Sequence, residues 1–240
     1  MGERQRVEKL FRRGREHEMR HEVAPARRYL DQALAEAAAA GFTDLVLSVH
    51  LTLGVVSHKA DDLVAARPHL ETALAMALEA GNAKMEAYAR QELGFLLLGE
   101  GKPEAARTEF LRVLGLAPAV GIVNLTGNGL SGLGVALLAL GRTKESIPFL
   151  LGALGIRTEI EDVEQQHLDL VHLAHAALLL GNGPVAARVV GLLTGSPETS
   201  SGLYAHDRRT FDTLVCELGA GPAAVGFDEA RTLVASLAVK

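Results

Sequence analysis

The sequence predicts an all-α fold, a right-handed superhelical array of about five antiparallel helix pairs with a C-terminal helical cap. Residues of one kind recur every 40 positions, most clearly the glycines Gly14, Gly54, Gly94 and Gly134. A fixed period of this size is typical of a solenoid. The composition agrees, because 48% of residues are hydrophobic but only 4% are aromatic, with Ala and Leu supplying most of the apolar ones. This suits close helix packing and argues against a β-sandwich.

Three further positions keep the same 40-residue period. The first is small: Ala26, Ala66, Ala106 and Ser146. The second is bulky and apolar: Leu30, Leu70, Phe110 and Leu150. The third follows three residues later: Ala33, Ala73, Val113 and Ala153. We therefore expect the same helix-packing arrangement in each copy.

The third copy shows how one repeat is built. Residues 83–99 are predicted to form a first helix, and residues 103–117 a second helix. Pro103 would occupy the first helical position, where its missing N–H costs nothing. Pro118 is predicted to stop this helix.

Two kinds of glycine are expected in each copy. Gly94 lies inside a predicted helix, where glycine costs about 1 kcal/mol relative to alanine, so we expect compensation by close approach of the second helix, with Ala106 as the small partner. Other glycines follow the helices, where left-handed caps and tight turns are favoured: Gly41, Gly81, Gly121, Gly101 and Gly141.

This pattern resembles the tetratricopeptide repeat. Leu93-Gly94 matches that family's Leu-Gly pair, and Ala106, Phe110 and Pro118 stand at its small, aromatic and proline positions. The period is 40 residues rather than the family's usual length of about 34, so both helices are expected to be longer. Copy one is weaker, with Arg13 in place of the leucine.

A fifth copy begins near Glu161, with an extra loop residue expected at Gly183-Pro184. The periodicity stops after about residue 195, so we assign 1–194 to repeats and 195–240 to C-terminal capping helices. Residues 195–202 are turn-rich and predicted to form a loop. Helices are predicted over 203–218 and 223–240, with a break at 219–222. They would cover the last apolar face of the solenoid.

The tail carries a second resemblance. The segments AARVVGLL (186–193), RRTFDTLVCELG (208–219) and FDEARTL (227–233) resemble the C-terminal end of large bacterial ATPase-type, maltose-activator-like transcription regulators. Phe227 stands where Trp is usual, and Ala230 replaces the usual Gly. The sequence has no G-x-x-x-x-G-K-[ST] motif and no separate helix-turn-helix segment. The resemblance therefore implies only a sensing or docking module, and the chain could be a domain of a larger regulator.

Charge and cysteine content indicate which cellular location and which classes of partner suit the protein. The net charge of −5 gives no nucleic-acid footprint. The first 30 residues are rich in arginine, but interleaved glutamates favour a solvated helix face over a DNA or membrane patch. Cys216 is the single cysteine, which favours a reduced, cytoplasmic location. We expect neither a signal peptide nor a membrane span.

One motif offers a choice between two interpretations. Residues 127–132, GNGLSG, satisfy G-x-G-x-x-G and would suit a dinucleotide site if a strand preceded them. The 40-residue register instead places them in the first helix of repeat four, and no second βα unit follows. We favour the helix, in which loosening by glycines would leave Asn124 and Asn128 facing the groove.

Catalytic and metal chemistry find little support. His172 and His175 share a helix face with His167 and Asp169 nearby, but a third metal ligand is not in place and H-E-x-x-H does not occur. Cys216 has no obvious histidine partner and is expected to be a packing residue. We therefore predict a non-enzymatic protein without cofactor or metal.

Function is expected on the concave face, which the first helices line in tetratricopeptide arrays. Tyr88 is expected to anchor a partner, and Gln91 and Asn128 to offer donors and acceptors to a peptide backbone. The predicted partner-binding residues are Arg12, Arg15, Tyr88, Gln91, Asn124, Asn128, Ser131, His172 and His175. The carboxylate clamp of chaperone-binding repeats is not found in register.

Two functions follow from this face. The first is a scaffold that binds a protein or peptide segment in the groove, in bacterial transcriptional or stress regulation. The alternative is a module that senses a peptide or small molecule, favoured if the tail closes a pocket over repeats four and five. Leu192, Leu193 and Phe227 would either seal the core or form a homodimer contact. Direct nucleic-acid and membrane binding are not expected.

Overall fold

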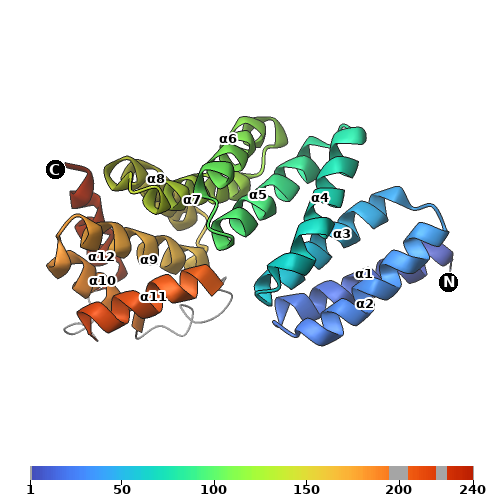
Figure 1. Cartoon of the computed structure of the whole chain (residues 1–240), viewed down its shortest axis with the longest axis horizontal. Coiled ribbons are helices and arrows are strands. Elements are labelled where there is room, and N and C mark those ends of the chain that lie inside the picture. Colours follow the sequence, from blue (N-terminus) through green and yellow to red (C-terminus); the bar gives the residue numbers. More distant parts are fainter. Residues whose placement is uncertain (1, 195–204, 220–225, 240) are drawn as a thin grey trace. The chain divides into compact units, whose positions relative to one another are not determined.

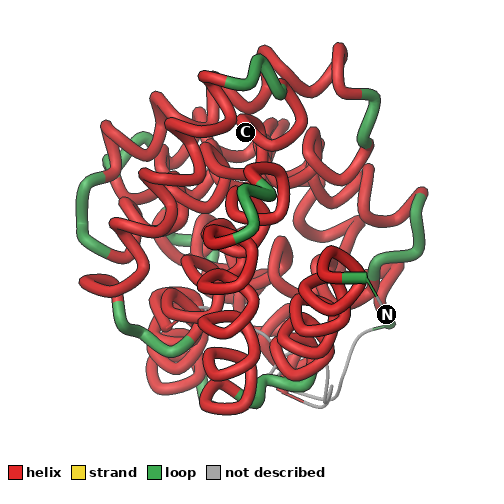
Figure 2. Tube along the Cα trace, turned by 90° about the vertical axis from the view of Figure 1, so that its right-hand side faces the viewer, coloured by secondary structure: helices red, strands yellow, loops and turns green. Residues whose placement is uncertain are grey.

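The structure is a computed structural model that describes residues 2–194, 205–219 and 226–239. Over these ranges the chain forms twelve α-helices and one short 3₁₀ helix, coloured along the sequence in Figure 1. Figure 2 shows the same chain as helices joined by short turns. The prediction of an all-α fold is therefore confirmed.

The first ten helices begin 20 residues apart. Most are 17 residues long, as expected for a repeat longer than the usual one. Their bounds are α1 Glu3–Met19, α2 Val23–Ala39, α3 Thr43–Lys59, α4 Leu63–Glu79, α5 Ala83–Gly99, α6 Pro103–Val120, α7 Val123–Ala139, α8 Thr143–Glu159, α9 Val163–Leu179 and α10 Gly183–Thr194. The tail adds α11 Ala205–Leu218, α12 Phe227–Ala235 and the 3₁₀ helix η2 Ser236–Val239.

The chain divides into two compact units, Met1–Leu96 and Leu97–Lys240, with the boundary inside α5. In the first unit α1 packs on α2, α2 on α3, and α3 on α4. In the second unit the same succession runs from α6 to α10. Each even-numbered helix from α2 to α8 buries one stripe, such as Leu70 with its neighbours Ala66, Ala73 and Ala77. Helices α3, α7 and α9 bury more of their surface, because each packs on several neighbours, whereas α1 at the end of the array buries Val7 and Gly14.

Every turn between these helices contains one residue with a left-handed backbone. Six of them are glycines with φ between 61° and 75°: Gly41, Gly81, Gly101, Gly121, Gly141 and Gly181. This confirms the predicted glycine caps and turns. His21, Asp61 and Glu161 adopt φ of 58°, 60° and 57° at the remaining turns. A residue with a side chain adopts this conformation only at a steric cost. The three turns therefore keep the same backbone geometry although they lack glycine.

Glycines inside the first helices permit close helix contact, as predicted, but the nearest partner is a leucine. A Cβ atom on Gly134 would lie 2.6 Å from Leu150 Cγ. The same contact joins Gly14 to Leu30 and Gly54 to Leu70. The small residue expected as partner is further away, since the Ala26 carbonyl oxygen lies 3.5 Å from a Cβ built on Gly14.

Two predictions about proline were wrong. Helix α6 continues through Pro118 to Val120 and ends at Gly121, whose φ is 69°. A proline in a last turn removes one hydrogen bond, and a left-handed glycine completes the cap. No extra loop residue occurs at Gly183-Pro184, because α10 begins at Gly183 in register with the other helices. Proline costs little in a first helical turn.

The described tail helices pack on the last repeat. Helix α11 packs on α9 and α10, and α12 packs on the same two helices. Leu193 is buried, and Leu192 and Phe227 pack against the same core, so these residues seal the core of this unit. The predicted loop at 195–202 and most of the break at 219–222 lie outside the described residues. None of the described helices combines the length and the apolar character needed to cross a membrane.

We predict opposite effects for two Gly→Ala substitutions in the second unit. Gly134→Ala should lower the free energy of unfolding by about 1–2 kcal/mol, because overpacking against Leu150 outweighs the gain in helix propensity. Gly115→Ala, in α6, should raise it by about 1 kcal/mol, since a Cβ there meets nothing within 4 Å. Urea unfolding followed by circular dichroism measures both. Equal effects would contradict the proposed glycine–leucine contact.

The turn at Glu161 yields a second stability prediction. Glu161→Gly should raise the free energy of unfolding by about 0.5–1 kcal/mol, because glycine adopts a positive φ without the steric cost. The reverse change, Gly141→Glu at a turn with φ of 73°, should lower it. The same urea titration measures both variants, and a loss of stability in Glu161→Gly would refute the interpretation of strain.

Candidate functional site

The first unit contains a cavity of about 430 Å³ lined by three first helices. Helices α1, α3 and α5 each contribute residues to it. Its lining is mixed. The apolar and aromatic members are Phe11, Leu51, Val55, Met85 and Tyr88, and the polar and charged members are Arg15, Glu18, Ser48, Thr52, Lys84 and Glu92. A cavity of this size, with apolar surface beside polar groups, suits a ligand side chain or a short segment.

The charged residues of this cavity differ in whether they are already paired. Lys59 Nζ lies 2.6 Å from Glu18 Oε1, and Gln91 Nε2 donates to Glu92 Oε1 at 2.9 Å. Arg15 and Lys84 line the same cavity and have no ion-pair partner among the residues described. The cavity therefore offers cationic groups to a ligand, while its acids are held by the protein.

The predicted site residues of the first unit fall into two groups. Arg15 and Tyr88 both line the cavity. Arg12 is exposed and lies 3.9 Å from Glu16, while Gln91 is buried beside Glu92. Neither Arg12 nor Gln91 is among the residues that line the cavity.

The second unit contains a buried polar network centred on Arg157 of α8. This side chain is 2% exposed, and its guanidinium donates to the Oδ1 atoms of Asn124, at 3.2 Å, and of Asn128. Its Nε atom is buried without a hydrogen-bond partner. Burial lowers the pKa of Arg157, although Asp169 and Asp162 oppose that shift.

The other repeats have a buried alanine where this network has Arg157. The positions equivalent to Arg157 are Ala37, Ala77 and Ala117, all buried. Gly127 complements this change, because a Cβ on it would lie 2.9 Å from Arg157 Cζ. The motif GNGLSG is thus part of α7, and its glycines make room for neighbouring side chains. The interpretation as a helix, rather than a nucleotide-binding turn, is confirmed.

Ser131 and Asp169 extend the network toward α9. Ser131 Oγ donates to Asp169 Oδ1 at 2.6 Å, while Asp169 Oδ2 is buried without a partner. Burial raises the pKa of Asp169 to about 6, and the hydrogen bond from Ser131 and the charge of Arg157 partly oppose the rise. The hydroxyl of Ser131 is therefore used within the protein.

The tail helix α11 contacts the histidines of α9. His172 Nε2 lies 3.3 Å from Asp207 Oδ1, and both side chains are almost fully buried. His175 is half-buried, and burial lowers its pKa.

Asn124 is exposed and Asn128 half-buried, so these two and His175 are the predicted residues of this unit that keep access to solvent. No three His, Cys, Asp or Glu side chains converge within the described ranges.

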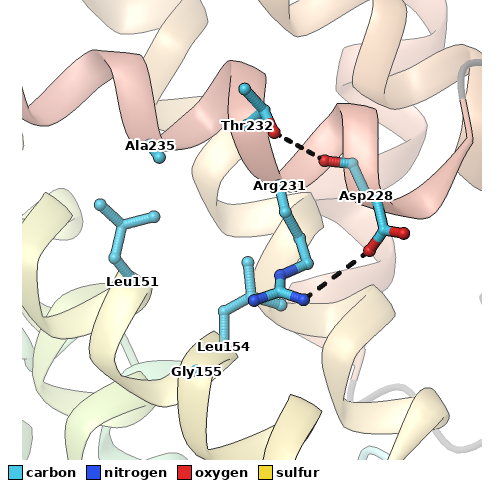
Figure 3. Close-up of a pocket in the computed structure, with 7 residues that line it drawn as sticks. All are labelled: Leu151, Leu154, Gly155, Asp228, Arg231, Thr232 and Ala235. Atoms are coloured by element: carbon cyan, nitrogen blue, oxygen red, sulfur yellow. Dashed lines mark hydrogen bonds and ion pairs between the residues drawn. The ribbon is translucent and has the colours of Figure 1, made fainter.

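A second cavity, of about 470 Å³, lies between α8 and α12 (Figure 3). Leu151, Leu154 and Gly155 form one wall. Arg231 and Asp228, 3.8 Å apart, stand on the other wall beside Thr232. A pocket closed by the tail over repeats four and five is the feature expected of a sensing module, but the sequence does not indicate which residues line it, because the approach of α12 to α8 depends on the fold of the tail.

Two histidines without ligand spacing in sequence meet in the first unit. His50 Nδ1 and His69 Nδ1 lie 2.9 Å apart, and the ring centroids are 5.2 Å apart. The distance between the nitrogen atoms fits a hydrogen bond in which the Nδ1–H of one ring donates to the Nδ1 of the other. Burial lowers the pKa of both rings, which favours the neutral form that the accepting ring of such a bond requires.

We predict that Arg157 and Gly127 are energetically coupled. Arg157→Ala should lower the free energy of unfolding by about 2–4 kcal/mol, because it leaves a cavity and an uncompensated buried Asp169. Gly127→Val in that background should restore at least half of the loss, since it fills the space as Val7 does in copy one. A double-mutant cycle measured by urea unfolding gives the coupling. Additive effects would contradict the contact.

Comparison with known proteins places the fold. No family model matches the chain, and no curated protein matches its sequence. Two crystal structures of a kinesin light chain-type protein from Podosopora anserina with nearly identical TPR-like repeats resemble it. The first, a single-residue variant, has a TM-score of 0.61 at 15% identity over 90% of this chain and 98% of that chain. The second has a TM-score of 0.59 at 14% identity over 89% and 97%. The chain therefore has a tetratricopeptide-like helical repeat fold.

Proposed function

We propose that this protein is a non-catalytic interaction scaffold that binds a protein or peptide segment along the first helices of its repeats. The observation that carries the proposal is the cavity lined by α1, α3 and α5, which collects Arg15 and Tyr88 from different repeats. Successive first helices present equivalent positions side by side. An extended segment can therefore contact several repeats at once.

The cavity is suited to side-chain recognition rather than to catalysis. Ser48 and Thr52 line it, but their hydroxyls donate to the carbonyl oxygens of Asp44 and Ser48 at 2.8 and 2.9 Å. Neither hydroxyl is held by a base that would activate it. The apolar part of its lining, which includes Tyr88, offers an anchor site, and Arg15 and Lys84 add positive charge.

The cellular process in which the scaffold acts is proposed from the sequence of the C-terminal tail. The segments 186–193, 208–219 and 227–233 support a place in bacterial transcriptional or stress regulation, in the cytoplasm. The described parts of this tail pack on repeat five as a cap. In such a regulator the repeats would serve for docking or sensing, while a separate effector would produce the regulatory response.

A sensing module is the second candidate, and the Arg157 network favours it. Arg157 stands where the other copies have the buried alanines Ala37, Ala77 and Ala117. Burying a charge in this place costs stability, and such exceptions often mark functional positions. Helix α11 contacts this region through Asp207. Binding of a small molecule or peptide here would then be transmitted through the tail. A thermal-shift screen of metabolites that stabilises wild type but not Asn128→Ala would support this candidate.

Peptide selection tests the scaffold proposal. A phage-displayed random dodecapeptide library is selected on the immobilised full chain, and the recovered peptides are measured by fluorescence anisotropy. Val55→Arg, which places a charge in the cavity, should weaken binding at least tenfold. Val64→Arg is the matched control, because Val64 is 88% exposed and outside the cavity, and it should leave affinity unchanged.

The folded state of both variants is verified by urea unfolding before affinities are compared. Failure to recover any binding peptide, or equal affinity in wild type and Val55→Arg, would contradict the proposed groove. Loss of binding in both variants would point to a general effect of added positive charge and would also count against it.

A further inference from the structure

The first helix pair carries a second surface, at Tyr29 of α2. Arg13 Cζ lies 5.6 Å and Arg28 Cζ 5.0 Å from the centre of the Tyr29 ring. His17 stacks on the same ring, with centroids 5.4 Å apart and planes inclined by 5°. Both arginines are exposed, and Tyr29 and His17 are half-buried. We call Arg13, His17, Arg28 and Tyr29 the Tyr29 cluster. None of its members lines the cavity described above.

The guanidinium groups of this cluster lack the carboxylate partners that several nearby arginines have. Arg4 is paired with Glu8 and Asp44, Arg6 with Glu36, and Arg27 with Asp62. Among the described residues, Arg13 and Arg28 have neither an ion-pair partner nor a hydrogen-bond acceptor. Two cations thus share one aromatic ring without a carboxylate to neutralise them.

The Tyr29 ring attracts both guanidinium groups. A guanidinium over an aromatic ring is attracted by the ring's π electrons, and the N–H donors that the ring does not engage remain available for carboxylates. His17 is itself held, because its Nδ1 contacts Glu22. The ring and its neighbours therefore preorganise two donor groups on adjacent helices.

Comparison with the other repeats argues against a purely structural role. Arg13 stands at the position of Leu53, Leu93, Leu133 and Leu173, which are all buried. A terminal repeat needs a polar residue at such a position for solubility. That need does not explain why two cations without ion-pair partners share one aromatic ring.

We propose that the Tyr29 cluster is a docking site for an acidic segment of a partner protein, with carboxylates bound by Arg13 and Arg28. Charge complementarity and the unfilled donors select this partner. Nucleic acid is disfavoured, because its binding rests on contacts with many phosphates along a backbone, whereas the cluster offers two guanidinium groups. This surface is separate from the proposed groove, so either site can exist without the other.

The test uses the full chain and a fluorescein-labelled dodecapeptide of alternating Glu and Gly, measured by anisotropy in 50 mM salt. Arg13→Gln with Arg28→Gln should weaken binding at least tenfold. Arg12→Gln with Arg20→Gln is the matched control, because it removes the same charge from the same region, and it should change affinity less than twofold. Urea unfolding establishes that each variant is folded.

Tyr29→Leu separates a built site from general electrostatic attraction. It keeps apolar bulk and net charge but removes the ring, so binding should weaken at least threefold, whereas Tyr29→Phe should bind as wild type does. Equal losses in the two double variants, or full binding by Tyr29→Leu, would overturn the proposal. So would undetectable binding of the peptide to wild type, or tighter binding of a labelled twelve-nucleotide oligo-dT.

Discussion

The structure depends on a contact between a glycine of a first helix and a leucine of the helix that follows, which the pairs α1–α2, α3–α4 and α7–α8 share. At Gly14, Gly54 and Gly134 a side chain would overlap the leucine sixteen residues later. The missing Cβ allows the second helix to seat its leucine against the backbone of the first. Because the position of this contact is fixed in both helices, it sets the register of each pair, and the short turns have to match it.

The turns satisfy this constraint with a constant geometry. One left-handed residue occurs every 20 positions from His21 to Gly181. Most are glycines, but three turns adopt the conformation at a steric cost. Paired helices of nearly equal length follow from this spacing, and the odd-numbered helices α1, α3 and α5 line one cavity. The proposed binding surface thus exists because equivalent helices recur along the chain. Its specificity comes from the positions at which the residue differs from one repeat to the next.

The sequence allowed the helices and their pairing to be predicted, because glycine and alanine recur at fixed positions. The regular spacing of 20 residues between successive turns was not predicted. Glycine occupies the turn position in most cases, but His21, Asp61 and Glu161 occupy it in the others. Pro118 and Pro184 misled the prediction of helix ends. Their effect depends on the position within a turn, which the tertiary packing decides.

The candidate site was only partly predictable. Arg15 and Tyr88 were expected to face a groove and do line a cavity, because the helical register fixes which face they occupy. The burial of Ser131 and His172 depends on Asp169 and Asp207, and the second of these lies on a tail helix whose position the register does not determine. A signal for Arg157 did exist. An arginine replaces alanine in its copy, and glycine replaces a larger residue at position 127.

The central claim is that the cavity of the first unit receives a bound segment. Methyl NMR of the full chain labelled at Leu, Val and Met, titrated with a selected peptide, tests this most directly. The account predicts that the methyl signals of Leu51, Val55 and Met85 shift in a saturable manner, while those of Val64, exposed elsewhere on the same unit, do not. Saturable binding that leaves the three cavity residues unshifted would contradict it.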